Sequence, residues 1–194
     1  MNTLFTGAKE RAQTLGLFVT SIWIVSLVGF LIPLQHALGI EPRTLTSLPG
    51  LATAPWVHAG LGHLVANTMP LLVLGWLAIL PRKMDFWQAT AGGALGAGIC
   101  AWMLGGSHTV HIGASGVVFG LFGYVLARGF FAWRLTDIAI AIPATMLYGF
   151  SMVLGLLPVY PGVSWQSHLG GAIGGVVAAR IFAKPPTQAA WPVY

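Results

Sequence analysis

Charged residues are scarce in this sequence. Only 7% of its 194 residues are charged, whereas 56% are hydrophobic, and the mean hydropathy is +0.81. A soluble domain averages about 25% charged residues, so this composition cannot cover a water-facing surface. It excludes a soluble enzyme, a disordered tail and a nucleic-acid-binding module. We expect an integral membrane protein embedded in a lipid bilayer.

Long uncharged stretches take the place of charge. A spanning helix needs roughly 20 mostly apolar residues, and six such stretches leave room only for short loops. We therefore expect an all-α, polytopic membrane protein. It would be a six-transmembrane-helix bundle in a single membrane domain over residues 1–194, with a short N-terminal segment 1–13 and a C-terminal tail 184–194. The first apolar run is too long for an ordinary signal peptide, so we expect it to be retained. The two shortest spans should extend into their flanking loops. The predicted spans are Thr14–Leu34, His63–Leu80, Phe86–Leu104, Ser115–Ala127, Ile138–Leu157 and His168–Phe182.

Basic residues predict the orientation, because cytoplasmic loops carry an excess of Lys and Arg. With a cytoplasmic N-terminus, eight of the nine Lys and Arg residues fall in cytoplasmic segments, and only Arg43 lies outside. We expect both termini in the cytoplasm, a bacterial plasma membrane, and no nucleic-acid partner. The histidines fall on the opposite, outer side, where a functional centre is expected. They are His36, His58, His63, His108, His111 and His168.

Cysteine and carboxylates are scarce. The single Cys100 has no partner for an internal disulfide and forms no metal cluster by itself. None of the four acidic residues falls inside a predicted span, and only Glu41 falls on the outer side. A Ser-His-Asp triad of the usual design therefore cannot form within the membrane. The other three are Glu10, Asp85 and Asp137.

A serine stands where an outer loop becomes the fourth span, in the string Gly113-Ala114-Ser115-Gly116. Backbone N–H groups and the positive end of a helix dipole point at such a position. This is the environment of an activated nucleophile with an oxyanion site. In a glycine-rich membrane helix the same string is more often a packing feature, so the serine needs a base to be catalytic.

The sixth span offers that base. His168, Gly171 and Gly175 share one helical face by their spacing, and the fourth span carries three glycines at a matching spacing. Small residues let membrane helices approach closely. If the two glycine faces meet, Ser115 and His168 come within hydrogen-bond reach at the same depth. The glycines of the fourth span are Gly116, Gly120 and Gly123.

The second span adds two polar groups. His63 and Asn67 are four residues apart and share a face near the outer end, while His58 lies five residues earlier. Polar side chains inside a membrane are functional candidates by default. The alternative for Asn67 is a hydrogen bond that only joins two helices.

Together these motifs resemble the rhomboid family of intramembrane serine proteases. The resemblance implies a six-helix bundle with a Ser–His dyad, in which Ser115 is the nucleophile and His168 the general base. It also implies that His63, Asn67 and the Ser115 backbone N–H stabilise the oxyanion, without cofactor or metal. The supporting positions that match are His58, Phe119, Gly113, Gly116 and Gly171.

Two positions depart from the family pattern. Phe119 stands one turn below Ser115, where many members have a tyrosine that packs on the histidine ring, so we expect the packing to be kept. The first outer loop reads Glu41-Pro42-Arg43 and lacks a Trp-Arg pair found in some members. Pro143 inside the fifth span and the loop 159–165 are candidates for controlling substrate entry.

The predicted function is cleavage of peptide bonds in or next to transmembrane segments of membrane-protein substrates. A catalytically inactive rhomboid-like protein that binds membrane helices is the first alternative. A histidine-ligated metal or haem protein is the second, although His58 and His63 lack the spacing of a helical metal motif. A channel or transporter is the third. The sequence carries no signal for an oligomeric state.

Overall fold

The computed structural model describes residues 2–183; the predicted tail 184–194 lies outside the described residues. Six helices of 18 residues or more make up most of this part of the chain. They are α1 (Asn2–Leu31), α4 (Leu61–Ile79), α5 (Lys83–Leu104), α6 (Ser115–Ala132), α7 (Leu135–Gly155) and α8 (Trp165–Phe182). The short helices α2 (Gln35–Leu38), η1 (Leu45–Ser47), α3 (Gly50–Thr53) and η2 (Ala54–Trp56) lie in the connection from α1 to α4.

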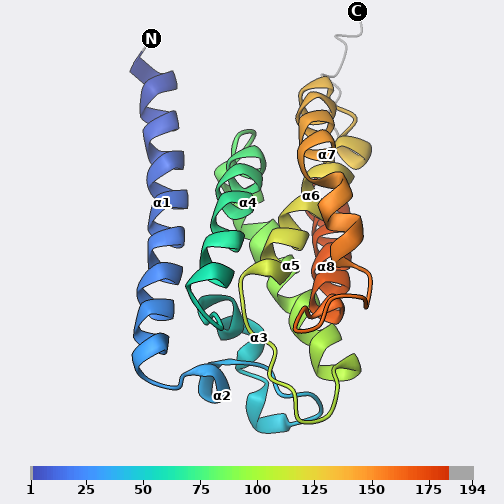
Figure 1. Ribbon diagram of the computed structural model, residues 1–194. Helices are drawn as coiled ribbons and strands as arrows, with labels where there is room; N and C mark the ends of the chain where they lie inside the picture. Colours follow the sequence, from blue (N-terminus) through green and yellow to red (C-terminus); the bar gives the residue numbers. More distant parts are fainter. Residues whose placement is uncertain (1, 184–194) are drawn as a thin grey trace, which may run out of the picture.

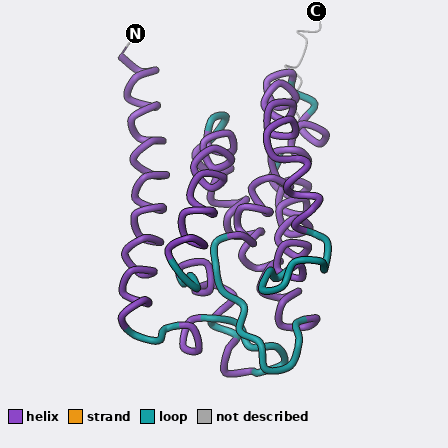
Figure 2. The backbone as a smooth tube through the Cα atoms, viewed as in Figure 1, coloured by secondary structure: helices purple, strands orange, loops and turns teal. Residues whose placement is uncertain are grey.

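The long helices run side by side along one direction, with α1 at one edge of the bundle (Figure 1). The start of α1 and the end of α8 lie at the same end, and the long connections gather at the other (Figure 2). Residues 2–183 contain no strand, only an isolated bridge between Ile40 and His111. The all-α prediction is confirmed.

Four of the long helices are long and apolar enough to cross a membrane. These are residues Gly7–Leu31 of α1, and the whole of α4, α6 and α7. In α5 and α8, glycine, alanine and polar residues replace large apolar side chains, so these two helices are less hydrophobic. Together the helices define an integral membrane protein.

Close backbone contact explains the glycines of α5, α6 and α8. A Cβ atom on Gly171 would overlap the Gly116 carbonyl oxygen, and one on Gly175 would overlap the Gly120 carbonyl oxygen. The predicted meeting of the two glycine faces is therefore confirmed. On its other side α8 packs as tightly on α5, where a Cβ on Gly92 would lie 2.6 Å from the Gly174 carbonyl oxygen.

Two helix ends differ from the predicted spans. As expected, the two shortest spans extend, because α6 continues to Ala132 and α8 begins at Trp165. α1 is helical from Asn2, and its candidate span runs over Gly7–Leu31, so the N-terminal segment 1–13 stays a prediction.

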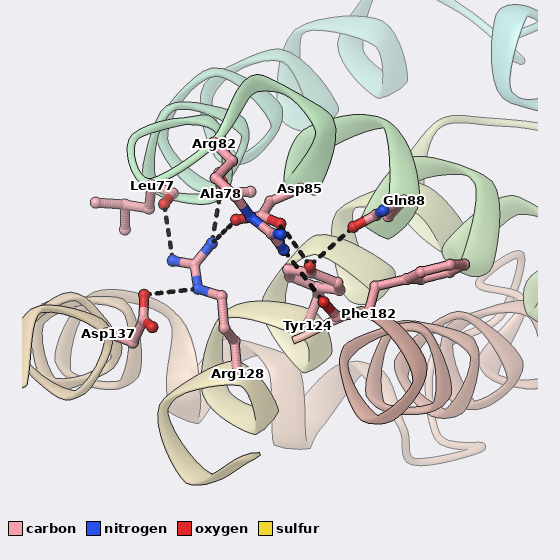
Figure 3. A network of polar contacts seen from close by, with 9 residues as sticks. All are labelled: Leu77, Ala78, Arg82, Asp85, Gln88, Tyr124, Arg128, Asp137 and Phe182. Carbon is pink, nitrogen blue, oxygen red and sulfur yellow. Dashed lines mark hydrogen bonds and ion pairs between the residues drawn. The ribbon is translucent and has the colours of Figure 1, made fainter. Parts of the chain in front are cut away.

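Charged residues lie inside the helices at the end of the bundle where α1 starts and α8 ends, and Figure 3 shows them from close by. Asp137 falls inside the candidate span Leu135–Gly155, so the prediction that no acidic residue falls inside a span is wrong. Arg128, on the last turn of α6, is 2% exposed. Its guanidinium donates to the Ala78 and Leu77 carbonyl oxygens at 3.0 and 3.3 Å, and its Nε lies 3.0 Å from Asp137 Oδ1. Because α4 and α7 supply these acceptors, α6 can keep a buried arginine.

Asp85 extends the same network. It lies in the first turn of α5 and accepts hydrogen bonds from the Tyr124 hydroxyl at 2.9 Å and from Arg82 at 2.5 Å, while Arg128 lies 3.5 Å from its second oxygen. Arg82 also donates to the Phe182 carbonyl oxygen of α8 at 3.2 Å, and the bond to Asp85 raises the pKa of its guanidinium. The network therefore joins α4, α5, α6, α7 and α8 (Figure 3).

Candidate active site

Ser115 is the first residue of α6, at the end of the loop that rises from α5 into the bundle (Figure 1). Two residues earlier, Gly113 has a φ of +112°, which disfavours any side chain, and a Cβ there would lie 2.7 Å from Cε1 of His63. A glycine is thus required both by the turn and by the histidine ring beside it. Ser115 is half-buried, and its hydroxyl makes no hydrogen bond to any described residue.

His168 lies in the first turn of α8 and is 7% exposed. Its ring stacks on the ring of Phe119, with centroids 4.1 Å apart and planes within 8°. The predicted aromatic packing at position 119 is therefore confirmed. At the edge of the His168 ring, Nδ1 lies 2.8 Å from the carbonyl oxygen of Gly155, the last residue of α7.

The starts of α6 and α8 are adjacent. A Cβ on Gly116, the neighbour of Ser115, would lie 3.6 Å from the carbonyl oxygen of Ser167, the neighbour of His168. Phe119 is one turn from Ser115 on the same face, so the ring that supports His168 also places it near the serine. No hydrogen bond joins Ser115 to His168 within residues 2–183, and in unliganded enzymes such bonds are often long and tighten only with substrate.

His63 and Asn67 approach this point from α4. The His63 ring faces Gly113 and lies edge-on to the ring of His58, with centroids 5.0 Å apart. Asn67 is 8% exposed, and its side-chain nitrogen donates to the His63 carbonyl oxygen at 3.1 Å. An amide nitrogen has two N–H groups, so one is still available to a ligand.

His58 fixes the loop in front of the serine. Its Nε2 accepts a hydrogen bond from the Ala114 N–H at 3.2 Å, so Nδ1 must carry the proton that it donates to Ser26 Oγ at 2.9 Å. The Ser26 hydroxyl in turn donates to the Trp56 carbonyl oxygen. Burial, and secondarily the neighbouring His63, lowers the pKa of His58 to about 4. The ring is therefore neutral near pH 7.

The remaining predicted histidines do not reach the serine. His111 is buried and pairs through its backbone with Ile40, while its ring contacts Ser164 and Thr109 at 2.6 and 3.0 Å; burial lowers its pKa. This ties together the loops that precede α6 and α8. His36 is exposed and pairs with Glu41 at 2.8 Å.

Arg43 anchors the connection between α1 and α4 to the end of α5. Its guanidinium donates to the Gly105 carbonyl oxygen at 2.9 Å and to Ser107 Oγ at 3.1 Å. Trp102 of α5 donates its indole N–H to the Thr44 carbonyl oxygen at 3.0 Å. An arginine of this loop and a tryptophan of α5 thus hold the loop in place, although the sequence lacks a Trp-Arg pair there.

No described carboxylate is placed to act on His168. Asp85 and Asp137 belong to the network around Arg128, which lies 13 residues along α6 from Ser115, or about 20 Å at the usual helical rise. Within residues 2–183, no three His, Cys, Asp or Glu side chains lie together in a way that could hold a metal ion. The site can therefore offer a hydroxyl, a histidine and several hydrogen-bond donors.

Two partners in the site have no signal in the sequence. Ser26 lies in the apolar last third of α1, and its contact with His58 spans 32 residues. The Gly155 oxygen is a backbone atom and has no residue signature.

A serine at a helix start, a stacked histidine and an amide–imidazole pair in a helical membrane protein define a candidate serine-hydrolase site of the membrane-embedded class. Comparison with known protein families matches residues 46–185 to the rhomboid domain. The chain belongs to the rhomboid family.

Similar individual proteins cover most of this chain. The chain is 40% identical over 181 residues to "Uncharacterized protein Rv1337" of Mycobacterium tuberculosis, covering 89% of this chain and 75% of that protein. It is 41% identical over 179 residues to "Uncharacterized protein ML1171" of Mycobacterium leprae, covering 87% and 70%. It is also 31% identical over 140 residues to "RHOMBOID-like protein 4" of Arabidopsis thaliana, covering 70% of this chain and 34% of that protein.

Proposed function

We propose that this protein is an intramembrane serine endopeptidase that cleaves peptide bonds in or next to transmembrane segments of other membrane proteins. The observation that carries the proposal is the meeting of α4, α6 and α8 at one end of the bundle. There Ser115 stands at a helix start, one turn from the Phe119 ring on which His168 is stacked.

The reaction would begin when His168 takes the proton of the Ser115 hydroxyl and the serine oxygen attacks the scissile carbonyl carbon. The resulting tetrahedral intermediate collapses to an acyl-enzyme as the histidine gives its proton to the leaving amine. Water then attacks the ester, with His168 again as base, and releases Ser115. No described carboxylate contacts His168, so the mechanism uses two residues rather than three.

The negative oxygen of the intermediate would be stabilised by three donors. The Ser115 backbone N–H lies at the start of α6, where helix N–H groups have no intrahelical partner. The free N–H of Asn67 and the ring of His63 are the other two, since His63 abuts Gly113 just before the serine. Such donors act most strongly where water is excluded.

The membrane arrangement follows from the two ends of the bundle. We propose that all six long helices span the membrane in one domain, with both termini in the cytoplasm and the serine site opening to the outer side. Seven of the nine Lys and Arg lie at the end with the termini, Arg43 lies at the other end, and Lys184 falls outside the described residues. The similarity to mycobacterial proteins supports a bacterial plasma membrane.

The test is cleavage of a single-span membrane substrate by the purified protein in lipid. Wild type should cleave, and Ser115→Ala and His168→Ala should each abolish cleavage. Ser151→Ala, at an exposed serine of α7, is the matched control and should retain activity. Cleavage that persists in Ser115→Ala would contradict the proposal.

An inactive helix-binding relative is the second candidate, because the Ser115 hydroxyl is not hydrogen-bonded to His168. It predicts that a single-span helix binds wild type and Ser115→Ala equally, and that neither cleaves it. A pull-down of the substrate beside the cleavage assay separates the two functions.

A further inference from the structure

We infer that the carbonyl group of Gly155, at the end of α7, fixes the proton of His168 on Nδ1 and so completes the catalytic base. Gly155 would then act as a positioning residue. This inference rests on the proposed function for its catalytic consequence, but the proton position is a property of the protein itself.

The direction of the hydrogen bond is set by chemistry. A carbonyl oxygen can only accept, so at 2.8 Å from the Gly155 oxygen the His168 Nδ1 must carry the hydrogen. A neutral imidazole has one N–H, so Nε2 is left with a lone pair. That nitrogen is the one free to take a proton from Ser115. In a Ser-His-Asp triad a carboxylate fixes the histidine tautomer in this way.

The carbonyl is available because of where α7 ends. The last four carbonyl groups of a helix have no partner within it, and Gly155 is the final residue of α7. The His168 ring therefore satisfies an orphan acceptor of α7, while α7 orients the ring.

The residue at position 155 has to be glycine for this approach. A Cβ there would lie 2.6 Å from Cζ of Phe119 and 3.3 Å from Nδ1 of His168. Any side chain would push against both the ring beneath the histidine and the atom that is held. Gly149 on the same helix has no such neighbours, since its nearest is the Thr145 methyl group at 3.4 Å.

The arrangement makes the base depend on the position of α7. This helix is mostly exposed at its surface, and its buried residues are only Asp137, Ala144 and Met152. Asp137 joins its first turn to Arg128. Near its other end, Met152 lies in the same hydrophobic core cluster as Phe119, and the Gly155 carbonyl oxygen contacts His168. When the last turns of α7 are displaced, His168 loses its orienting partner.

The direct test is ¹⁵N NMR of the full-length protein with labelled histidine in lipid, with His168→Gln used to assign the signal. We expect a protonated Nδ1 and an unprotonated Nε2 at neutral pH in wild type, and a mixture of tautomers in Gly155→Ala. A predominant Nε2–H form in wild type would overturn the inference. This measurement does not need activity, so it separates the inference from the proposed function.

Kinetics supply the second arm. Gly155→Ala should lower kcat with little change in KM, because a misplacement of about 1 Å can reduce rate by roughly 10²-fold; Gly149→Ala should cleave like wild type. Met152→Ala, which loosens the same end of α7 without adding a side chain, should lower kcat in the same sense, whereas the 82% exposed Met146→Ala should not. Unchanged kcat in both Gly155→Ala and Met152→Ala would contradict the positioning role.

Discussion

The two ends of this bundle use polar residues in opposite ways. At one end Arg128, Asp85 and Asp137 are buried and bonded to one another and to backbone carbonyl groups. At the other end Ser115 is half-buried and its hydroxyl has no hydrogen-bond partner in the described residues, while His63 contacts its neighbours mainly through its ring. Charged groups that form ion pairs with one another can stay buried in the fold, whereas polar groups with free bonding capacity are available for chemistry. Substitutions at the two ends should therefore have separable effects on stability and on activity.

The largest effect is expected at the paired end. Arg128→Leu leaves the Asp137 carboxylate buried without its ion-pair partner and removes one of the two arginines beside Asp85. Breaking a buried ion pair in this way destabilises a protein by about 3–5 kcal/mol. Equilibrium unfolding in mild detergent would measure the loss. Arg82→Gln, at a side chain that is 47% exposed, is the matched control and should destabilise much less. Equal losses in the two variants would mean that burial of the network contributes nothing.

The next largest effect is expected at the end of the bundle that contains Ser115, and it should change kcat rather than the free energy of unfolding. Asn67→Ala removes one proposed oxyanion donor and should lower kcat by about 10²–10³-fold. The unfolding midpoint should change little, because the only hydrogen bond lost lies within α4. If Asn67→Ala turns over at the wild-type rate, this residue is not an oxyanion donor.

His58 lies beside the site, yet both of its ring nitrogens are hydrogen-bonded. Its pKa is lowered to about 4 in the folded protein, whereas a histidine in an unfolded chain titrates near 6.5. The unfolded state therefore binds the proton first. The contribution of neutral His58 to the free energy of unfolding is complete above about pH 6.5. It falls between about pH 6.5 and 4, by about 2 to 3 kcal/mol.

Unfolding measured from pH 7.5 to 4 checks this expectation. His58→Gln should reduce the fall of the unfolding free energy between about pH 6.5 and 4. His36→Gln, at an exposed histidine, should leave that fall unchanged. A wild-type profile with no slope in that window would contradict the account of His58.

The smallest effect is expected at Phe119. Aromatic pairs contribute about 0.5–1.5 kcal/mol beyond burial, so Phe119→Leu, which keeps an apolar side chain but loses the stack, should lower kcat by about 2- to 10-fold. Phe122→Leu on the same helix is the control, since among the described residues Phe122 has no ring contact with His168. Equal rates for both variants would show that the 4.1 Å stack does not support the base.

The sequence predicted those parts of the molecule that residue type and spacing determine. Six apolar stretches predicted the long helices, and matched glycines on two of them predicted the contact that the Gly171–Gly116 and Gly175–Gly120 approaches confirm. The roles of Ser115, His168, His63 and Asn67 remain predictions, although α4, α6 and α8 bring these residues to one end of the bundle.

The parts that were missed depend on partners distant in the sequence. The sequence places Arg128 and Asp137 in loops, because charged residues are typical of the ends of spans. Nothing in the local pattern indicated that the side chains of these two residues pair between α6 and α7. The acceptor for His168 is a backbone oxygen 13 residues away. Such an atom becomes a candidate only when the helix that carries it has been placed.

Labelling with a fluorophosphonate probe tests the central claim most directly, because it asks whether Ser115 is an activated nucleophile without needing the natural substrate. The protein in lipid bilayers is treated with the probe, and the modified residue is located by mass spectrometry. The account predicts labelling at Ser115, strong reduction in His168→Ala, and no labelling of Ser26 or Ser164. Absence of label on Ser115, or label that persists unchanged in His168→Ala, would contradict it.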